Sequence, residues 1–168
     1  MITKLDIKVG NPDSDIIIIE YFDPNCYHCK ELHKKLMQAS EKFGDDALFV
    51  FKPIALWKHS ALQIQALHIA AEEGLYFEML RKQFIFQSPK TGLSLREIFE
   101  IGGDIGMDKM KLARRMIRGD YLSYIMSQYK ASRDNDIISI PSVIINGRTV
   151  AQNSVTLECI EEFIGELK

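Results

Sequence analysis

The sequence has little of what several classes of protein require. It contains three cysteines in 168 residues, whereas a secreted scaffold held together by disulfides normally uses four or more. Its net charge of -2 argues against a strongly basic surface, so we expect no nucleic-acid partner. No apolar run approaches the roughly 18 residues needed to span a bilayer. What remains is a chain of globular composition, 46% hydrophobic and 26% charged, with about the length of one domain.

The beginning of the chain also lacks the apolar core of a signal peptide. Its first fifteen residues carry five charged side chains, Lys4, Asp6, Lys8, Asp13 and Asp15. This pattern fits a cytosolic protein, and it equally fits a mature exported chain whose leader has been removed.

The first third of the chain has a strand–helix–strand pattern. The β-branched and aromatic run at 16–22 predicts a strand buried on both faces. Apolar residues at intervals of three or four then predict a helix from Cys26 to Gly44. A second strand is expected over 47–51 and ends at Pro53. This order predicts a right-handed parallel crossover.

About eighty residues without a sheet pattern follow. The spacing of their apolar residues predicts helices over residues 59–73, 75–86, 93–101, 108–117 and 121–133. Gly102-Gly103 and Gly119-Asp120 are among the residues that separate these helices. The sequence therefore predicts a helical block inserted into a small α/β sheet.

Sheet character returns near the end of the chain. Residues 142–145 predict a strand, and Asn146-Gly147 is typical of a hairpin turn that leads into a return strand at 149–150. Ser154 is expected to cap a last helix. Cys159 lies on the apolar face of that helix, where we expect a small buried hydrophobe, with a third redox partner as the alternative.

Cys26 and Cys29 form a Cys-x-x-Cys pair at the junction of a buried strand and a helix. The first cysteine is placed at the helix N-terminus, where free N–H groups and the helix dipole favour a thiolate. The second lies one turn further on, close enough to close a disulfide. Because only a thiolate attacks a disulfide, this placement predicts Cys26 as a nucleophile and Cys29 as its resolving or leaving partner.

Three other interpretations of the cysteine pair compete with this one. A structural zinc site could use Cys26, Cys29 and His33, but no second pair is spaced to supply a fourth ligand. Covalent haem requires a histidine directly after the second cysteine, where this chain has Lys30. The last interpretation is two unreactive thiols on a helix face. Redox chemistry is favoured, and we expect neither a metal nor a cofactor.

The stretch Ile18-Ile19-Glu20-Tyr21-Phe22-Asp23, leading into Cys26-Tyr27-His28-Cys29, resembles the active site of the DsbA-like thiol–disulfide oxidoreductases of the thioredoxin superfamily. The helical insertion resembles theirs as well. Ile140-Pro141 is similar to the cis-proline loop of the superfamily, which lies beside the cysteines and binds substrate. The resemblance covers nearly the whole chain. It implies an α/β fold with a thioredoxin-like central sheet, formed by 1–54 and 135–168, and an all-helical subdomain inserted at 55–134.

The resemblance also implies roles for single residues. Cys26 would be the nucleophile and Cys29 the buried resolving thiol, while His28 would stabilise the Cys26 thiolate. Glu20 would relay the proton of Cys29, with a solvated charge near a strand end as the alternative. Tyr27 completes the variable pair, and the best-known oxidase of the family has proline there.

Two further residues are expected to bind substrate. The resemblance implies that Ile140 and Pro141 bind it and that the peptide bond between them is cis. A β-branched residue before this proline is found in oxidases and thioredoxin, whereas the disulfide isomerases typically have threonine.

These features predict a thiol–disulfide oxidoreductase that introduces disulfides into exported proteins. Its expected partners are cysteine-containing substrate proteins and a membrane redox partner that recycles its disulfide. The expected location is the periplasm, with the cytoplasm as the alternative. Two other functions stay open: a reductase or isomerase of the same fold, and a non-redox module that binds peptides.

Overall fold

The computed structural model describes residues 2–137, 139–151 and 154–167. These residues divide into two compact units. The first comprises 1–22, 28–52 and 139–168, and the second comprises 23–27 and 53–138. The short segment that contains Cys26 thus belongs to the second unit, whereas Cys29 belongs to the first.

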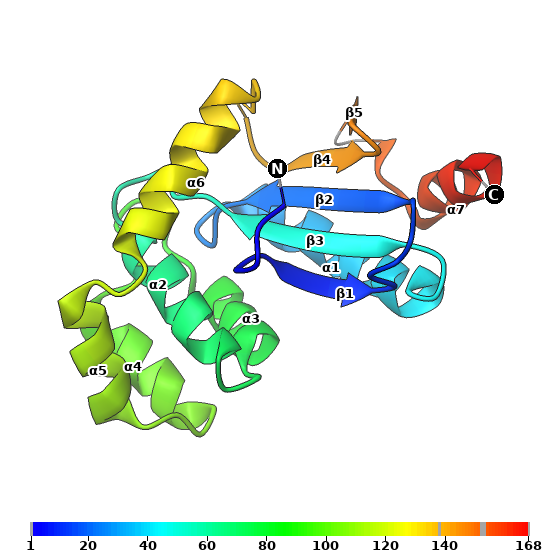
Figure 1. Ribbon diagram of the computed structural model, residues 1–168. Coiled ribbons are helices and arrows are strands. Elements are labelled where there is room, and N and C mark those ends of the chain that lie inside the picture. The colour runs from blue at the N-terminus through cyan, green and yellow to red at the C-terminus, as the bar shows by residue number, and fades with distance from the viewer. Residues whose placement is uncertain (1, 138, 152–153, 168) are drawn as a thin grey trace. The chain divides into compact units, whose positions relative to one another are not determined.

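The first unit contains a five-stranded sheet in the order β1-β3-β2-β4-β5, and Figure 1 shows β1, β3, β2 and β4 lying side by side in this order. Its strands and helices are β1 (Ile7–Gly10), β2 (Ile17–Phe22), α1 (Tyr27–Phe43), β3 (Leu48–Pro53), β4 (Ser142–Ile145), β5 (Arg148–Val150) and α7 (Leu157–Leu167). Strands β2 and β3 are neighbours and α1 connects them. The N–H of Leu48 donates to the carbonyl of Ile16 (2.8 Å), which joins the beginnings of both strands, so the two run in parallel.

Strand β1 was not predicted from the sequence. It pairs antiparallel with β3 at the edge of the sheet, and its residues alternate between half-buried and exposed. An edge strand of four residues with Lys8 in it carries no continuous apolar run, so the sequence pattern is weak there.

The hairpin between β4 and β5 is confirmed. Asn146 and Gly147 both have positive φ angles, 44° and 81°, as a tight turn between two antiparallel strands requires. The side chain of Asn146 also accepts a hydrogen bond from the N–H of Ile17 (2.7 Å), which ties this turn to the start of β2.

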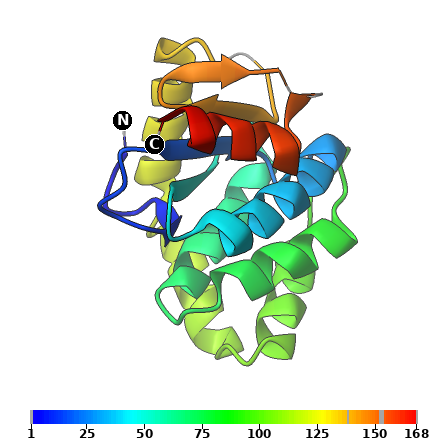
Figure 2. The same cartoon turned by 90° about the vertical axis from the view of Figure 1, so that its right-hand side faces the viewer.

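The expected cap of the last helix is wrong. Helix α7 begins at Leu157, and the hydroxyl of Thr156 accepts a hydrogen bond from the N–H of Cys159 (3.1 Å). Thr156 therefore caps the helix, because its hydroxyl lies directly before the first turn, two residues after Ser154. Helices α1 and α7 lie side by side (Figure 2), and an ion pair of 2.9 Å joins Lys42 to Glu161.

One face of the sheet packs against α1. The imidazole of His33, on α1, contacts the rings of Phe22 and Phe51, and paired strand residues share a face. Glu20 lies on this face, since it is two residues from Phe22. Apart from Glu20 and the exposed Arg148, the strand residues that the pairing places on this face are apolar: Ile7, Val9, Ile18, Phe22, Phe49, Phe51, Val143, Ile145 and Val150.

The second unit is helical, with α2 (Ser60–Ala71), α3 (Tyr76–Phe86), α4 (Leu95–Asp104), α5 (Lys109–Arg118) and α6 (Leu122–Asp134). Helix α2 contacts each of the other four, and nine of its twelve residues are buried. A helix that is buried on most sides is the centre of such a bundle.

Helix α4 departs from its predicted bounds at both ends. Ser94 and Glu97 form a capping box, so the helix begins at Leu95 and not at residue 93. It then continues through Gly102 and Gly103, which were expected to end it. Gly102 is buried, and a Cβ atom there would lie 2.6 Å from the side chain of Leu112. The glycine therefore permits close packing of α4 on α5.

Candidate active site

The cysteine pair lies where the central strand β2 leads into α1. Cys26 directly precedes the first residue of α1, and Cys29 lies in its first turn. Both thiols are reduced and buried, with exposed fractions of 7% for Cys26 and 0% for Cys29. Tyr27 and His28, between them, are exposed. The chain thus places Cys26 at a helix N-terminus, the position that favours a thiolate.

A buried polar network holds the segment that carries Cys26. The carboxylate of Asp23 accepts hydrogen bonds from the N–H of Asn25 (2.8 Å), the hydroxyl of Ser60 (2.7 Å) and the N–H of Leu56 (2.9 Å). The main chain of Asp23 also accepts a bond from the N–H of Cys26 (3.0 Å). All these groups belong to the second unit, so the helical unit fixes the backbone around the first cysteine.

Asn25 extends this network. Its side-chain amide donates to the hydroxyl of Ser60 (2.9 Å) and to the side-chain carbonyl of Gln63 (2.8 Å), and this Gln63 oxygen also accepts a bond from the N–H of Leu93 (2.9 Å). Its own side-chain carbonyl accepts from the N–H of Ser88 (3.4 Å). Sequence reasoning missed this network, because Asp23 was noted only as part of the stretch that resembles the family's active site and Asn25 was given no role.

Burial raises the pKa of the Asp23 carboxyl above its ordinary value. The hydrogen bonds donated by Asn25, Ser60, Leu56 and Trp57 act in the opposite direction, and burial outweighs them. Asp23 is therefore a carboxyl group that holds its proton more tightly than a solvated one.

Glu20 lies in β2 and is buried, with 1% of its surface exposed. The alternative that it is a solvated charge is therefore wrong. Its Oε2 atom lies 2.6 Å from Nδ1 of His33. The other oxygen, Oε1, is buried and has no hydrogen-bond partner among the described residues. Sequence reasoning considered His33 only as a zinc ligand, and the pair joins residues 13 positions apart.

His33 and Cys29 lie on the same buried face of α1, one turn apart. Side chains four residues apart on a helix are neighbours, with about 5–6 Å between their Cβ atoms. Cys29, His33 and Glu20 are thus all buried in the first unit, on the side of the sheet that α1 covers.

A second buried ion pair lies on the opposite face of the sheet. Nζ of Lys52 is 2.7 Å from the carboxylate of Asp6, and both side chains are almost fully buried. Lys52 follows Phe51 in β3, so its side chain points to the other face. Burial, and then the charge of Asp6, raise the pKa of Tyr21.

The remaining predicted residues lie at the start of β4 and on α7. The peptide bond between Ile140 and Pro141 is cis, as the resemblance implied, and Pro141 directly precedes β4. Ile140 is half-buried and Pro141 is buried. Cys159 was expected to be buried but is half-buried.

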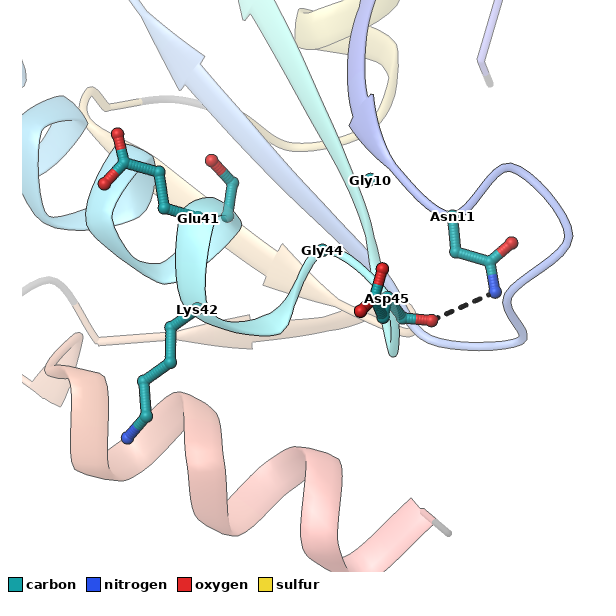
Figure 3. Close-up of a pocket in the computed structure, with 7 residues that line it drawn as sticks. Gly10, Asn11, Glu41, Lys42, Gly44 and Asp45 are labelled. Carbon is teal, nitrogen blue, oxygen red and sulfur yellow. Dashed lines mark hydrogen bonds between the residues drawn. The ribbon is translucent and has the colours of Figure 1, made fainter.

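A polar pocket of about 520 Å³ lies at the other end of α1 (Figure 3), lined by Gly10, Asn11, Ser40, Glu41, Lys42, Gly44 and Asp45. A hydrogen bond from the side chain of Asn11 to the carbonyl of Asp45 (3.2 Å) crosses it. Neither cysteine and neither member of the Glu20–His33 pair lines this pocket.

Within the described ranges, no cluster of three or more potential ligand side chains is placed to hold a metal ion. In the same part of the chain, no helix is both long and apolar enough to cross a membrane.

A reduced Cys-x-x-Cys pair at the start of a helix, after the central strand of a mixed sheet, defines a protein of the thioredoxin class. The sequence confirms this class over nearly its whole length. The family described as Thioredoxin matches residues 3–166, and the chain belongs to that family. The predicted α/β thioredoxin-like fold is therefore confirmed.

Solved structures share the same fold. DsbA of Chlamydia trachomatis superposes with a TM-score of 0.83 at 15% identity, over 99% of this chain and 93% of the other. BdbD of Bacillus subtilis gives a TM-score of 0.82 at 17% identity, over 97% and 92%. The resemblance to the DsbA-like fold is confirmed.

Two curated relatives are similar in sequence. The Na(+)/H(+) antiporter NhaA 1 of Mycobacterium sp. (strain KMS) is 25% identical over 83% of this chain, which spans 23% of the antiporter. A Rickettsia conorii protein, provisionally described as a protein-disulfide oxidoreductase, is 22% identical over 89% of this chain and 56% of its own length. The chain thus spans about a quarter of the antiporter and about half of the Rickettsia protein.

Proposed function

We propose that the protein is a thiol–disulfide oxidoreductase that works through Cys26 and Cys29. The observation that carries this proposal is the placement of the pair, with Cys26 directly before the first residue of α1 and Cys29 buried in the first turn. The helix N-terminus stabilises a thiolate on the first cysteine, and one helical turn separates it from its partner.

In the oxidising direction, the reaction begins with a Cys26–Cys29 disulfide. A substrate thiolate attacks Sγ of Cys26, so a mixed disulfide forms and Cys29 leaves as a thiolate that takes up a proton. A second substrate thiolate then attacks the substrate sulfur of the mixed disulfide, and Cys26 leaves as a thiolate. Two electrons pass from the substrate dithiol to the protein. Glu20, buried in β2, supplies the proton that Cys29 takes up and receives it again in the reverse reaction.

We favour oxidation of exported proteins over reduction or isomerisation. His28 occupies the place of the histidine in the strongly oxidising relatives, where it stabilises the Cys26 thiolate and with it the reduced protein. Tyr27, beside it, is exposed and available to a partner surface. Ile140 and Pro141 bind the substrate peptide in this proposal. The setting is the periplasm, and a membrane redox partner reoxidises the dithiol.

The decisive experiment measures exchange with glutathione in four proteins, the starting protein and three single variants. The starting protein should equilibrate with a potential between about -120 and -200 mV. The Cys26→Ser and Cys29→Ser variants should lose turnover, whereas Cys159→Ser, the matched control, should keep it. A potential below about -250 mV would assign the protein to the reductants. If both cysteine variants still bind a peptide partner and the starting protein shows no exchange, the protein is a binding module.

A further inference from the structure

The proposed reaction leaves several buried titratable groups without a role, and one of them lies beside Glu20. His33 is 7% exposed and its ring packs between Phe22 and Phe51. A purely structural position in such an apolar environment would suit an aliphatic or aromatic residue. Instead the chain places an imidazole there, with its Nδ1 atom 2.6 Å from the carboxylate of Glu20.

Among the described residues, hydrogen bonds satisfy only part of the Glu20 carboxylate that His33 contacts. Oε1 of Glu20 is buried and accepts no hydrogen bond from the described residues, and the neighbouring strand residues on that face are apolar. Burying a charged carboxylate is costly unless it is paired and hydrogen-bonded. The hydrogen bond between Nδ1 of His33 and Oε2 of Glu20 therefore holds one oxygen of this carboxylate, while Oε1 stays open to a further partner.

Among the described residues of the first unit, no other charged side chain takes over this role. Lys52 and Asp6 pair with each other on the opposite face of the sheet, where Tyr21 also lies. Arg148 is on the same face as Glu20 but at the exposed end of β5. The buried residues of α7 are Ile160 and Ile164. The group that remains nearby is Cys29, one helical turn from His33 on the buried face of α1.

We propose that His33 is a positioning residue for the resolving step, holding the Glu20 carboxylate ready to accept the proton of Cys29. This inference rests on the proposed function and concerns one step of it. When a mixed disulfide is resolved towards the oxidised protein, Cys29 loses its proton to Glu20 and its thiolate attacks Sγ of Cys26. The Cys26–Cys29 disulfide forms, and the other thiol leaves as a thiolate that takes a proton from water.

The experiment follows a single turnover with glutathione disulfide in a Cys159→Ser background. The Cys26 thiolate attacks glutathione disulfide and forms a mixed disulfide, which Cys29 then resolves. Acid quenching and mass measurement give the rates of formation and decay between pH 5 and pH 9. Formation does not use the proton of Cys29, so it serves as an internal control.

Three single variants and one double variant distinguish the effect of the His33–Glu20 hydrogen bond from the effect of changing its surroundings. His33→Leu removes the donor and should slow decay at pH 7 by about ten- to one-hundredfold, the usual worth of a hydrogen bond to a charged group. His33→Asn places an amide N–H near the position of Nδ1 and should stay within about threefold of the starting protein. Glu20→Gln should match His33→Leu, and the double variant should be no slower than either, as for residues that act as a unit.

Lys52→Met is the matched control, because it breaks a buried ion pair on the other face of the same sheet. It should lower stability and leave the decay profile unchanged. The proposal is overturned if His33→Leu decays like the starting protein, or if His33→Asn is as slow as His33→Leu. Should His33→Leu fail to fold, Glu20→Gln decides, and an unchanged decay in it overturns the proposal. If the starting protein forms no mixed disulfide at all, the proposed function itself is wrong.

Discussion

At the scale of single residues, the two cysteines differ in their surroundings although they are three positions apart. Cys26 directly follows Asn25, whose side chain is bound to Ser60 and Gln63 of the second unit. Cys29 shares a helix face with His33 in the first unit. This difference suits a pair in which one thiol attacks and the other resolves.

The thiol of Cys26 should titrate well below the pKa of about 8.5 of a free cysteine. The cause is the N-terminus of α1, assisted by His28. Absorbance of the thiolate, measured against pH on the reduced Cys159→Ser protein, gives the midpoint. His28→Ala should raise that midpoint, while Lys30→Ala, which alters a charge of the same helix outside the pair, serves as the control. A midpoint near 8.5 in the starting protein would contradict the mechanism.

Asp23 should make stability depend on pH in a defined direction. Burial raises the pKa of its carboxyl in the folded protein above the ordinary 3.8, so the folded state holds the proton more tightly than the unfolded state. Its contribution is thus fully present below the ordinary pKa and is lost as the pH rises through the raised value. The free energy of unfolding from urea titrations should fall over this interval relative to Asp23→Asn. Parallel curves for the two proteins would contradict this assignment.

At the scale of elements, polar side chains at or just before the first turn decide where the helices begin. Ser94 and Glu97 cap α4, and the carboxylate of Asp108 accepts the N–H groups of Met110 and Lys111 at the start of α5. These bonds satisfy backbone donors that no helical carbonyl can reach. The helix ends thus follow from local polar chemistry more than from the apolar spacing.

Thr156→Ala should destabilise the protein by about 1 kcal/mol, the usual value of a helix N-cap. Its hydroxyl accepts the N–H of Cys159 at the start of α7. Ser154→Ala is the matched control and should change the free energy of unfolding little. Urea denaturation of both variants measures the difference. Equal losses in the two variants would show that the cap does not act through this hydroxyl.

At the scale of the whole molecule, the redox state of the dithiol is linked to folding. Stabilising the Cys26 thiolate stabilises the reduced protein and leaves the disulfide form comparatively unstable, as an oxidant requires. The chain has ordinary globular length and needs no disulfide to hold its core. A closed Cys26–Cys29 disulfide can therefore be costly for the fold.

The oxidised protein should accordingly unfold at lower urea concentration than the reduced one. A difference of about 1.4 kcal/mol corresponds to roughly 30 mV for a two-electron couple, so the stability gap and the measured potential must agree. Paired urea titrations of both redox forms, in the Cys159→Ser background, provide the comparison. A more stable oxidised form would reassign the protein to the reductants.

The sequence by itself determined the strand–helix–strand start, the hairpin at Asn146-Gly147 and the redox pair, because each depends on residues a few positions apart. It missed β1, whose edge pairing with β3 joins residues about forty positions apart. It also missed the bonds from Asp23 and Asn25 to Ser60 and Gln63, and it left Glu20 open between a relay and a solvated charge. Only the tertiary structure decided these, since whether a carboxyl is buried, and which side chain it meets there, depends on strand pairing and helix packing that no local pattern encodes.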